Sequence, residues 1–321
     1  MTGYIIRRVL WGIAVLILVS ALTFCFFTIF PSADPAVLRA GRNASPHTIA
    51  YIRHELGLDR SLPVQFETYM KGIFLHLNFG YSYYSGASVR SLITARLPAT
   101  LSLTVGAVVL WVGLGIPVGI LSALKRHTVI DRMAMGAALV AVSMPAFWLG
   151  LVMLFLLAAD IGQFHVLPGA NSYVGLTADP VKWLTSLILP WLTLAATQAA
   201  VYSRLLRGSL IESMGEDYIR TARAKGLAER RVVWRHGVRS AITPVMTVLG
   251  IDIGLLLGGA VITETVFDIP GIGRLNYEAI VRSDFPIIQG TVLLAAFFVV
   301  VANVVVDIAY AYLDPRVRLR S

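Results

Sequence analysis

Long runs of apolar residues alternate with shorter polar connections along this chain. A helix needs about 20 mostly apolar residues to cross the hydrocarbon core of a bilayer, and six segments meet that requirement. They cover roughly residues 9–30, 98–124, 134–159, 183–206, 241–266 and 287–312. The pattern predicts an all-α polytopic membrane protein with six transmembrane helices.

The positive charges orient these six spans. The N-terminus, the turn at 125–133, the segment 204–239 and the C-terminal tail together hold 17 of the 27 lysines and arginines. The short connections 160–182 and 267–286 hold three, and the remaining seven lie in the segment 31–97. Cytoplasmic loops carry an excess of Lys and Arg, and loops as long as 31–97 are not counted in this rule. We therefore expect both termini in the cytoplasm and residues 31–97 outside.

Composition agrees with a membrane protein and excludes several other classes. Of the 321 residues, 57% are hydrophobic and only 14% are charged, and the mean hydropathy is +0.74, far from the soluble range. The net charge of +9 sits at the ends of apolar spans, which argues against nucleic-acid binding. The lone Cys25 cannot form an intramolecular disulfide, and the histidines lack metal-ligand spacing. The apolar run after Arg7 and Arg8 is too long for a signal-peptide core, so we expect a retained anchor, with a cleaved signal as the alternative.

The external segment after the first span is too long for a simple loop. Ser45-Pro46 is a typical helix start, and Gly57 is expected to end that helix. Leu62-Pro63 begins a second predicted helix, whose apolar face includes Phe66, Tyr69, Met70, Ile73 and Phe74. These helices are expected to lie on the outer surface or to cap the bundle. A passive lid and a docking site for a partner both remain open.

Small residues and prolines mark features inside the spans. Gly115 and Gly119 have the spacing that lets two helices approach closely in lipid. Gly250, Gly254 and Gly258 fall on one face of the fifth span and predict a helix contact, within the subunit or across a dimer. Prolines break helical hydrogen bonds, so a kink is expected in the third span, at Pro145.

Polar residues at bilayer depth are candidates for a translocation pathway. Asp252 lies near the middle of the fifth span, and an ionisable group there must face protein or water. The alternative is a structural carboxylate that is satisfied by a neighbouring span. The pathway candidates are Gln198, Asp252, Gly254 and Asn303.

A basic segment from Glu216 to Pro244 separates the fourth and fifth spans. Between Arg204 and Arg239 there are nine Lys/Arg and four acids, and central charges are costly in a bilayer. Apolar residues recur at helical spacing, and Gly226 interrupts them. We expect two short helices at the cytoplasmic surface, hinged at Gly226. The alternative is a solvated basic loop that only sets topology.

Signatures of catalysis are absent. The chain has no GxxxxGK[ST] phosphate loop, no HExxH and no readable Ser/His/Asp arrangement, so no catalytic or metal-binding residue is predicted. Gly271-Ile272-Gly273 is expected to be a tight turn. A proton-coupled transporter usually has more intramembrane acids or histidines and internal repeats. The sequence therefore predicts a membrane bundle with no ATPase of its own and with a cytoplasmic segment able to receive one.

Motifs along nearly the whole chain resemble one family. YIRTARAKGL at 218–227, ERRVVWRH at 229–236 and the downstream Pro244 resemble the cytoplasmic coupling motif of bacterial ABC importer permeases, and more narrowly the dipeptide/oligopeptide permease family. Where the general motif begins Glu-Ala-Ala, this chain reads Arg220-Thr221-Ala222. Matching pieces are LGLDRSLPVQF at 56–66, LNFGYSY at 77–83, RLPATL at 96–101, SMPAFWLG at 143–150, ETVFDIPGIGRL at 264–275 and YLDPRVRL at 312–319. The 56–66 and 77–83 pieces suggest the first, B-type, of two permease subunits.

The resemblance implies a type I ABC importer fold in the bacterial cytoplasmic membrane. Residues 1–30 would be a cytoplasmic stub and first helix, 31–93 an external helical segment, 94–313 the transmembrane domain with its coupling region at 207–240, and 314–321 a cytoplasmic tail. The implied partners are a second homologous permease in a hetero-dimer, two ABC ATPases or a fused one, an external solute-binding protein, a peptide and membrane lipid. ATP and Mg would be bound by the ATPases, with no cofactor in this chain. Coupling would be carried by Glu216, Tyr218, Arg220, Thr221, Ala222, Arg223, Ala224, Lys225, Gly226 and Leu227.

Three alternatives remain open from the sequence. A secondary, ion-coupled transporter would need no ATPase. A membrane scaffold or sensor would use the cytoplasmic segment only for docking. Within the ABC architecture, the cargo could instead be a nickel chelate or glutathione.

Overall fold

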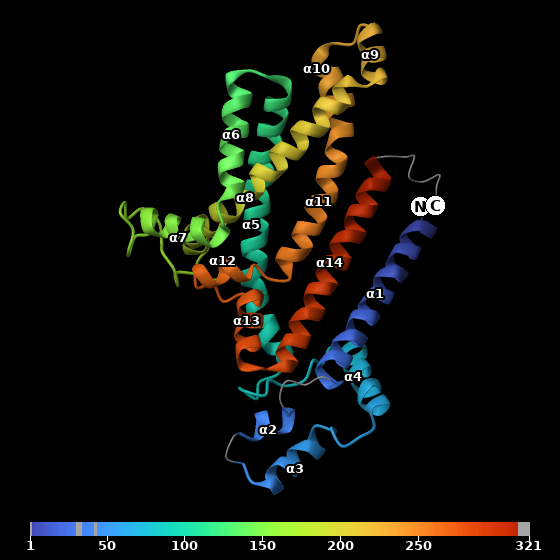
Figure 1. The fold of residues 1–321 in the computed structure, drawn as a ribbon, viewed down its shortest axis with the longest axis vertical. Coiled ribbons are helices and arrows are strands. Elements are labelled where there is room, and N and C mark those ends of the chain that lie inside the picture. Colours follow the sequence, from blue (N-terminus) through green and yellow to red (C-terminus); the bar gives the residue numbers. More distant parts are fainter. Residues whose placement is uncertain (1, 30–33, 42–43, 314–321) are drawn as a thin grey trace.

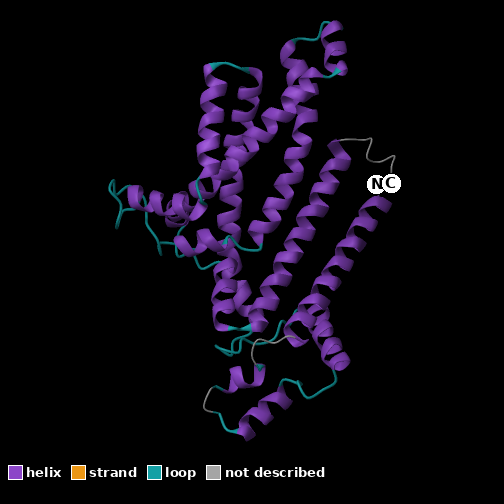
Figure 2. Ribbon diagram, in the orientation of Figure 1, coloured by secondary structure: helices purple, strands orange, loops and turns teal. Residues whose placement is uncertain are grey.

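Helices make up the regular structure of this chain. The computed structural model describes residues 2–29, 34–41 and 44–313. Over these ranges it contains fourteen α-helices and one π-helical segment, and Figure 2 shows them joined by loops without a named strand. The predicted all-α class is confirmed. The tail 314–321 and most of the 312–319 motif lie outside the described residues.

Five helices are long and apolar enough to cross a membrane, and a bent pair supplies a sixth crossing if it is counted as one span. Length and composition thus agree with the six predicted spans. The five are α1 (Thr2–Ile29), α5 (Val89–Leu124), α8 (Pro180–Gly215), the helix that runs from Glu229 to Leu257 and ends as α11 (Arg239–Leu257), and α14 (Phe285–Leu313).

The third span, predicted at 134–159 with a kink at Pro145, begins earlier, at Val129, and is broken into two helices. It consists of α6 (Val129–Ser143) and α7 (Ala146–Leu157), which meet at an angle of 102°. Pro145 occupies the N-cap of α7, where its ring and missing N–H end the preceding helix. The predicted kink is therefore present, and it leaves α7 roughly perpendicular to α6 at one side of the bundle (Figure 1).

The fifth span ends earlier than predicted. Its helix stops at Leu257, and α12 (Val261–Val266) follows as a separate short helix after a break at Gly258 and Gly259. Gly259 has a φ of +123°, a conformation open to glycine but rarely to other residues. The external connection then forms α13 (Ile272–Arg282). The tight turn predicted over Gly271-Ile272-Gly273 is therefore wrong, because Gly271 is the N-cap of α13 and the next two residues begin the helix.

The basic segment also departs in part from expectation. The fourth span extends to Gly215, well beyond the predicted end at 206. Only one short helix stands apart, α9 (Asp217–Ala224). The expected second one, α10 (Glu229–Arg231), continues through the π-helical η1 (Val232–Val238) into α11. No left-handed turn separates Glu229 from Leu257, so the chain continues as one helix.

The cytoplasmic side follows from the arrangement in Figure 1. The first residues of α1 and the last turns of α14 point toward the end of the molecule that carries α9. This end holds the Lys- and Arg-rich connections, which the positive-inside rule assigns to the cytoplasm. At mid-chain, α9 and α10 project farther than any other described helix (Figure 1).

The outer segment folds into three helices below the bundle (Figure 1). They are α2 (Pro35–Ala40), α3 (Pro46–Glu55) and α4 (Leu62–His76). The Ser45 hydroxyl accepts a hydrogen bond from the Thr48 N–H, as expected of an N-cap. Phe24 of α1 packs against Phe66 and Tyr69 of α4, with ring centroids 5.3 Å apart in both pairs. The two helices predicted for this segment are thus confirmed.

Helices α5 and α8 form the centre of the bundle. A Cβ at Gly119 would lie 2.7 Å from the Ser203 carbonyl oxygen, so a glycine is needed where the two helices cross. The neighbouring Gly115 lies similarly close to Ala199. Trp111 and Tyr202 are fully buried nearby, with ring centroids 5.9 Å apart. The predicted small-residue contact is confirmed as an α5–α8 contact.

The glycine row of the fifth span packs against α14 of the same chain. A Cβ at Gly250 would lie 2.1 Å from Val306, and one at Gly258 would lie 2.7 Å from Ala295. The contact face predicted from the sequence is therefore confirmed as one within the subunit.

Candidate functional site

Helix α9 carries the candidate coupling site and packs on η1 through one apolar face. Ile219 is fully buried and Ala222 nearly so, and both contact Val232. Met214 and Leu227 close the edges of this small cluster. Because the apolar residues of α9 face its own chain, the close approach of Ala222 serves packing within the subunit.

The opposite face of α9 is polar and exposed. It presents Tyr218, Arg220, Thr221, Arg223, Ala224 and Lys225. Among these, Arg223 donates to both carboxylate oxygens of Glu229 over 3.0 and 2.7 Å, which raises the pKa of the Arg223 guanidinium. Arg220 pairs more loosely with Asp217, at 3.3 Å. Exposed pairs of this kind contribute little stability, so they leave these arginines able to exchange partners.

Gly226 forms the turn that ends α9. Its φ is +77°, and a Cβ there would meet nothing within 4 Å. The Gly226 N–H donates to the Arg223 carbonyl over 2.9 Å, and the Leu227 N–H donates to that of Ala222. This is the left-handed glycine at a helix C-terminus. The hinge predicted at Gly226 is therefore a defined turn whose requirement for glycine is conformational.

The cytoplasmic end of α8 contacts both α9 and η1. The Ser213 hydroxyl contacts the Tyr218 hydroxyl at 2.7 Å and donates to the Gly237 carbonyl over 3.2 Å. A Cβ at Gly237 would lie 2.6 Å from the Met214 sulfur. These contacts join α9 to α8, which precedes it, and α8 to η1, which continues into α11. Glu216, at the N-cap of α9, joins α8 to α9.

Two of the four pathway candidates come together in the bundle. The Gln198 amide and the Tyr202 hydroxyl, both on α8, donate to one oxygen of Asp252 over 3.1 and 2.8 Å. Asp252 is half-buried. A carboxylate at this depth is thus supplied with two donors from a neighbouring span, which is the arrangement expected for the structural alternative. Its role in a pathway stays a prediction.

The other two pathway candidates lie elsewhere. Gly254 is buried against α14, where a Cβ would be 2.8 Å from the Val299 Cα. Asn303 is exposed on α14. Gly254 and Asp252 therefore occupy different faces of α11, one toward α14 and one toward α8.

Two buried carboxylates, each held by several hydrogen-bond donors, were not found by sequence reasoning. Asp131, at the start of α6, accepts hydrogen bonds from Arg207, Ser122 and the His127 N–H. The signal available for it was Thr128, three residues earlier, which caps α6. The second is that of Glu264 of α12, which is fully buried. Its signals were its place at the edge of an apolar span and at the start of the ETVFDIPGIGRL motif.

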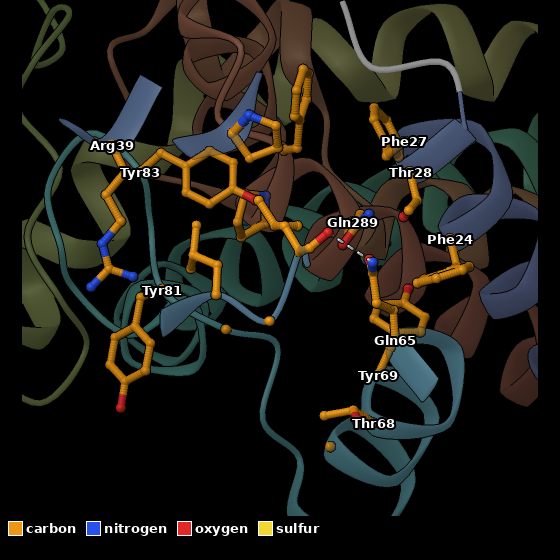
Figure 3. Close-up of a pocket in the computed structure, with 18 of the residues that line it drawn as sticks. Phe24, Phe27, Thr28, Arg39, Gln65, Thr68, Tyr69, Tyr81, Tyr83 and Gln289 are labelled. Atoms are coloured by element: carbon orange, nitrogen blue, oxygen red, sulfur yellow. Dashed lines mark hydrogen bonds between the residues drawn. The ribbon is translucent and has the colours of Figure 1, made fainter. Parts of the chain in front are cut away.

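A pocket of about 790 Å³ opens at the outer face, where α1, the outer helices and the start of α14 meet. Figure 3 shows Phe24, Phe27 and Tyr69 on one side and Arg39 with Tyr83 on the other. Burial and the nearby Asp284 carboxylate raise the pKa of Tyr83 to about 12. Ion pairs join Arg53 to Asp34 and Arg39 to Glu55 along its wall. The pocket thus combines an aromatic surface with charges of both signs.

Within the described ranges, no group of three or more His, Cys, Asp or Glu is arranged to hold a metal ion.

Comparison with known proteins identifies the family. Residues 115–319 match the model of the binding-protein-dependent transport system inner membrane component, and residues 1–104 match the N-terminal model of the same membrane components. A Brucella abortus (strain 2308) protein named as a peptide transport system permease is 42% identical over 318 residues, with 99% of each chain covered. The dipeptide transport system permease protein DppB of Escherichia coli K12 is 38% identical over 338 residues, with 99% of each chain covered. The chain therefore belongs to the family of inner membrane components of binding-protein-dependent transport systems, and it is a multi-pass permease subunit of an ABC importer in the cytoplasmic membrane.

Proposed function

We propose that this chain is a permease subunit that moves di- or oligopeptides inward, driven by ATP hydrolysis in separate subunits. The observation that carries the cargo assignment is similarity along the whole chain, 42% and 38% identity, to proteins named as peptide and dipeptide permeases. The absence of a phosphate-loop sequence supports the placement of ATP and Mg in partner ATPases.

Helix α9 is the proposed contact with an ATPase. It projects beyond the other described helices (Figure 1) and exposes Arg220, Arg223 and Lys225. Closure of the ATPases would push α9, and the Ser213–Gly237 and Met214 contacts would carry this movement into α8 and η1. This chain contributes no catalytic group to the hydrolysis.

The remaining partners follow from the family. A second, homologous permease would complete the translocation pathway as a hetero-dimer, with two ATPases or a fused one beneath it. An external solute-binding protein would deliver peptide to the outer face. The aromatic and charged outer pocket, about 790 Å³ in volume, supports a docking role for the segment 31–93 over a passive lid. Gln198 and Asp252 remain proposed as pathway residues, and a hydrogen bond of 3.1 Å joins them.

The testing experiment is the ATPase activity of the complex in proteoliposomes. This chain is reconstituted with its second permease, ATPases and binding protein, and peptide is added or withheld. Stimulation that requires both the binding protein and peptide is the expected result. Stimulation by a nickel chelate or by glutathione instead would replace the cargo and retain the architecture.

Failure of this chain to assemble with any ATPase would overturn the proposal. Uptake driven by a proton gradient without ATP would then identify a secondary transporter, and partner binding without flux would identify a scaffold.

A further inference from the structure

Glu264 is a buried carboxylate without a basic partner among the described side chains. It is fully buried on α12. One oxygen accepts from the Thr100 hydroxyl over 2.8 Å, and the other accepts from the Arg274 backbone N–H over 2.8 Å. The Arg274 guanidinium turns away and bonds to Asp268 and Glu278. The carboxylate is therefore held by neutral donors from two other helices.

Thr100 extends this network from α5 to α13. Its hydroxyl donates to Glu264 and accepts from the Ile272 N–H over 2.8 Å. Like Glu264, it is fully buried. Three hydrogen bonds thus join α5, α12 and the first turn of α13 at one point.

Glycines make room for this arrangement. A Cβ at Gly271 would lie 2.2 Å from the Glu264 carboxyl carbon. A Cβ at Gly259 would lie 2.3 Å from the Gly273 Cα, so the break after α11 is in direct backbone contact with α13. Both glycines are required by close approach, and together they bring the end of the fifth span to the Glu264 site.

The packing of α13 against α5 does not require a carboxylate. An apolar cluster that includes Val89, Ile93, Ile272 and Leu275 already buries this contact. A buried ionisable group is costly, and a polar network is stabilising only when every member is satisfied. What the carboxylate adds to apolar packing is directional bonding, which fixes the orientation of one helix on another.

The site lies at the outer end of a continuous connection from the coupling region. The helix from Glu229 to Leu257 starts just after α9 and ends next to Gly259. Through Glu264, the hairpin of α12 and α13 is tied to α5.

We infer that Glu264 is a positioning residue of the transport cycle. Its carboxylate and the Thr100 hydroxyl hold the α12–α13 hairpin against α5 through hydrogen bonds, which we call the lock. Through this lock, movement of α11 is transmitted to the outer side of the bundle. This role rests on the proposed function of α9 as the ATPase contact. Without the lock, the ATPases would still hydrolyse ATP, but the outer side of the bundle would often fail to change conformation when the ATPases open or close.

A matched pair at Thr100 tests the inference in the complete reconstituted complex. Thr100→Ser keeps the hydroxyl and both hydrogen bonds. Thr100→Val has a similar size, but it leaves the Ile272 N–H and one Glu264 oxygen without their partner. The measured quantity is the number of peptide molecules imported per ATP hydrolysed, which does not depend on the amount of folded protein.

We expect Thr100→Val and Glu264→Gln to lower this ratio about fivefold or more, with Thr100→Ser close to the unmodified chain. The Gln amide has one acceptor oxygen where the carboxylate has two, so it can keep the bond from the Arg274 N–H or the bond from the Thr100 hydroxyl, but not both. A Thr100→Val complex with less protein but an unchanged ratio would make the network merely structural and would overturn the inference. An unmodified complex that imports no peptide would overturn the proposed function itself, which is a distinguishable result.

A distance measurement tests the lock independently of transport. Spin labels are placed at the exposed Leu101 on α5 and Ile280 on α13, in a chain whose lone Cys25 is replaced by Ser. A single narrow distance is expected with and without ATP in the Thr100→Ser chain, and a broad one in Thr100→Val. Equally narrow distributions in both variants would show that apolar packing alone holds α13, against the inference.

Discussion

Arg207 of α8 donates two parallel hydrogen bonds to Asp131 at the start of α6, over 2.7 and 2.8 Å. The Ser122 hydroxyl and the His127 N–H bond to the same carboxylate, whose side chain is only 5% exposed. Four donors from α5, from the turn after it and from α8 therefore converge on one acid. This joins the α5–α6 hairpin to the helix that carries α9.

Arg207 donates to Asp131 through two nitrogen atoms, so we predict that another cation at this position lowers the stability of the protein. Arg207→Lys keeps the charge but only one donor direction, and Arg207→Met removes both. We expect the melting temperature of the purified complex to fall in both variants, and further for Met, because a buried carboxylate then loses its cation. Equal melting temperatures for the Lys and Met variants would mean that the charge of Arg207 does not matter.

The turn at Gly226 predicts a strict conformational requirement. Gly226→Pro is incompatible with a φ of +77° and removes an N–H that donates to Arg223, whereas Asn tolerates left-handed backbone. We expect Gly226→Pro to abolish coupled transport, with all spans still inserted, and Gly226→Asn to retain most of it. Peptide uptake per ATP hydrolysed is the measurement, with protease accessibility as the control for insertion. Normal uptake in Gly226→Pro would contradict the coupling role of this turn.

Neighbouring alanines on α9 predict two different defects. Ala224 is exposed and Ala222 is buried against η1. Ala224→Trp should leave the fold intact and weaken copurification of the ATPases by blocking the exposed face of α9. Ala222→Trp should overpack the cluster instead, at a cost of about 1–3 kcal/mol, and lower the melting temperature. If Ala224→Trp still retains the ATPases fully, the docking face lies elsewhere.

The hydrogen bonds of Asp252 predict how much stability its substitution would cost, and this separates a structural role from a pathway role. Interhelical hydrogen bonds in membranes contribute on average about 0.6 kcal/mol each, so loss of the bonds from Gln198 and Tyr202 removes little of a typical stability of about 5–15 kcal/mol. We therefore expect Asp252→Leu to remain folded and inserted and to lose transport. Tyr202→Phe, which removes one donor but retains the carboxylate, should keep most of the transport. Degradation of Asp252→Leu with normal specific uptake by the remainder would favour the structural role.

The glycine row predicts a position-dependent effect of one methyl group. At Gly254 a Cβ would meet the Val299 Cα at 2.8 Å, whereas at Gly113 nothing lies within 4 Å. Gly254→Ala should therefore destabilise the chain by about 1–3 kcal/mol through overpacking of α11 against α14. Gly113→Ala should be neutral, or stabilising by up to about 1 kcal/mol, because Ala is the better helix former. Thermal unfolding of the two purified variants gives the comparison.

Local patterns accounted for much of the architecture. Apolar runs predicted the spans, because every backbone group in lipid must be bonded within its own helix. Ser45, Gly57 and Gly226 act through their own backbone and nearest neighbours, so their caps and turns were also predicted. Helix ends were less accurate: the extension of α8 to Gly215 and the union of α10, η1 and α11 depend on packing of Ser213 and Met214 against Gly237.

The sequence by itself determined the membrane class, the orientation of the spans and the place of the basic segment that we propose for coupling, because these follow from hydropathy, charge and short-range backbone preferences. Only the tertiary structure decided which acids have partners. Asp131 meets Arg207 across 76 residues, Asp252 meets Gln198 across 54, and Glu264 meets Thr100 across 164. Such pairs depend on which helices cross and where, and the spacing of residues along one helix shows a contact face without showing which side chain of another helix meets it.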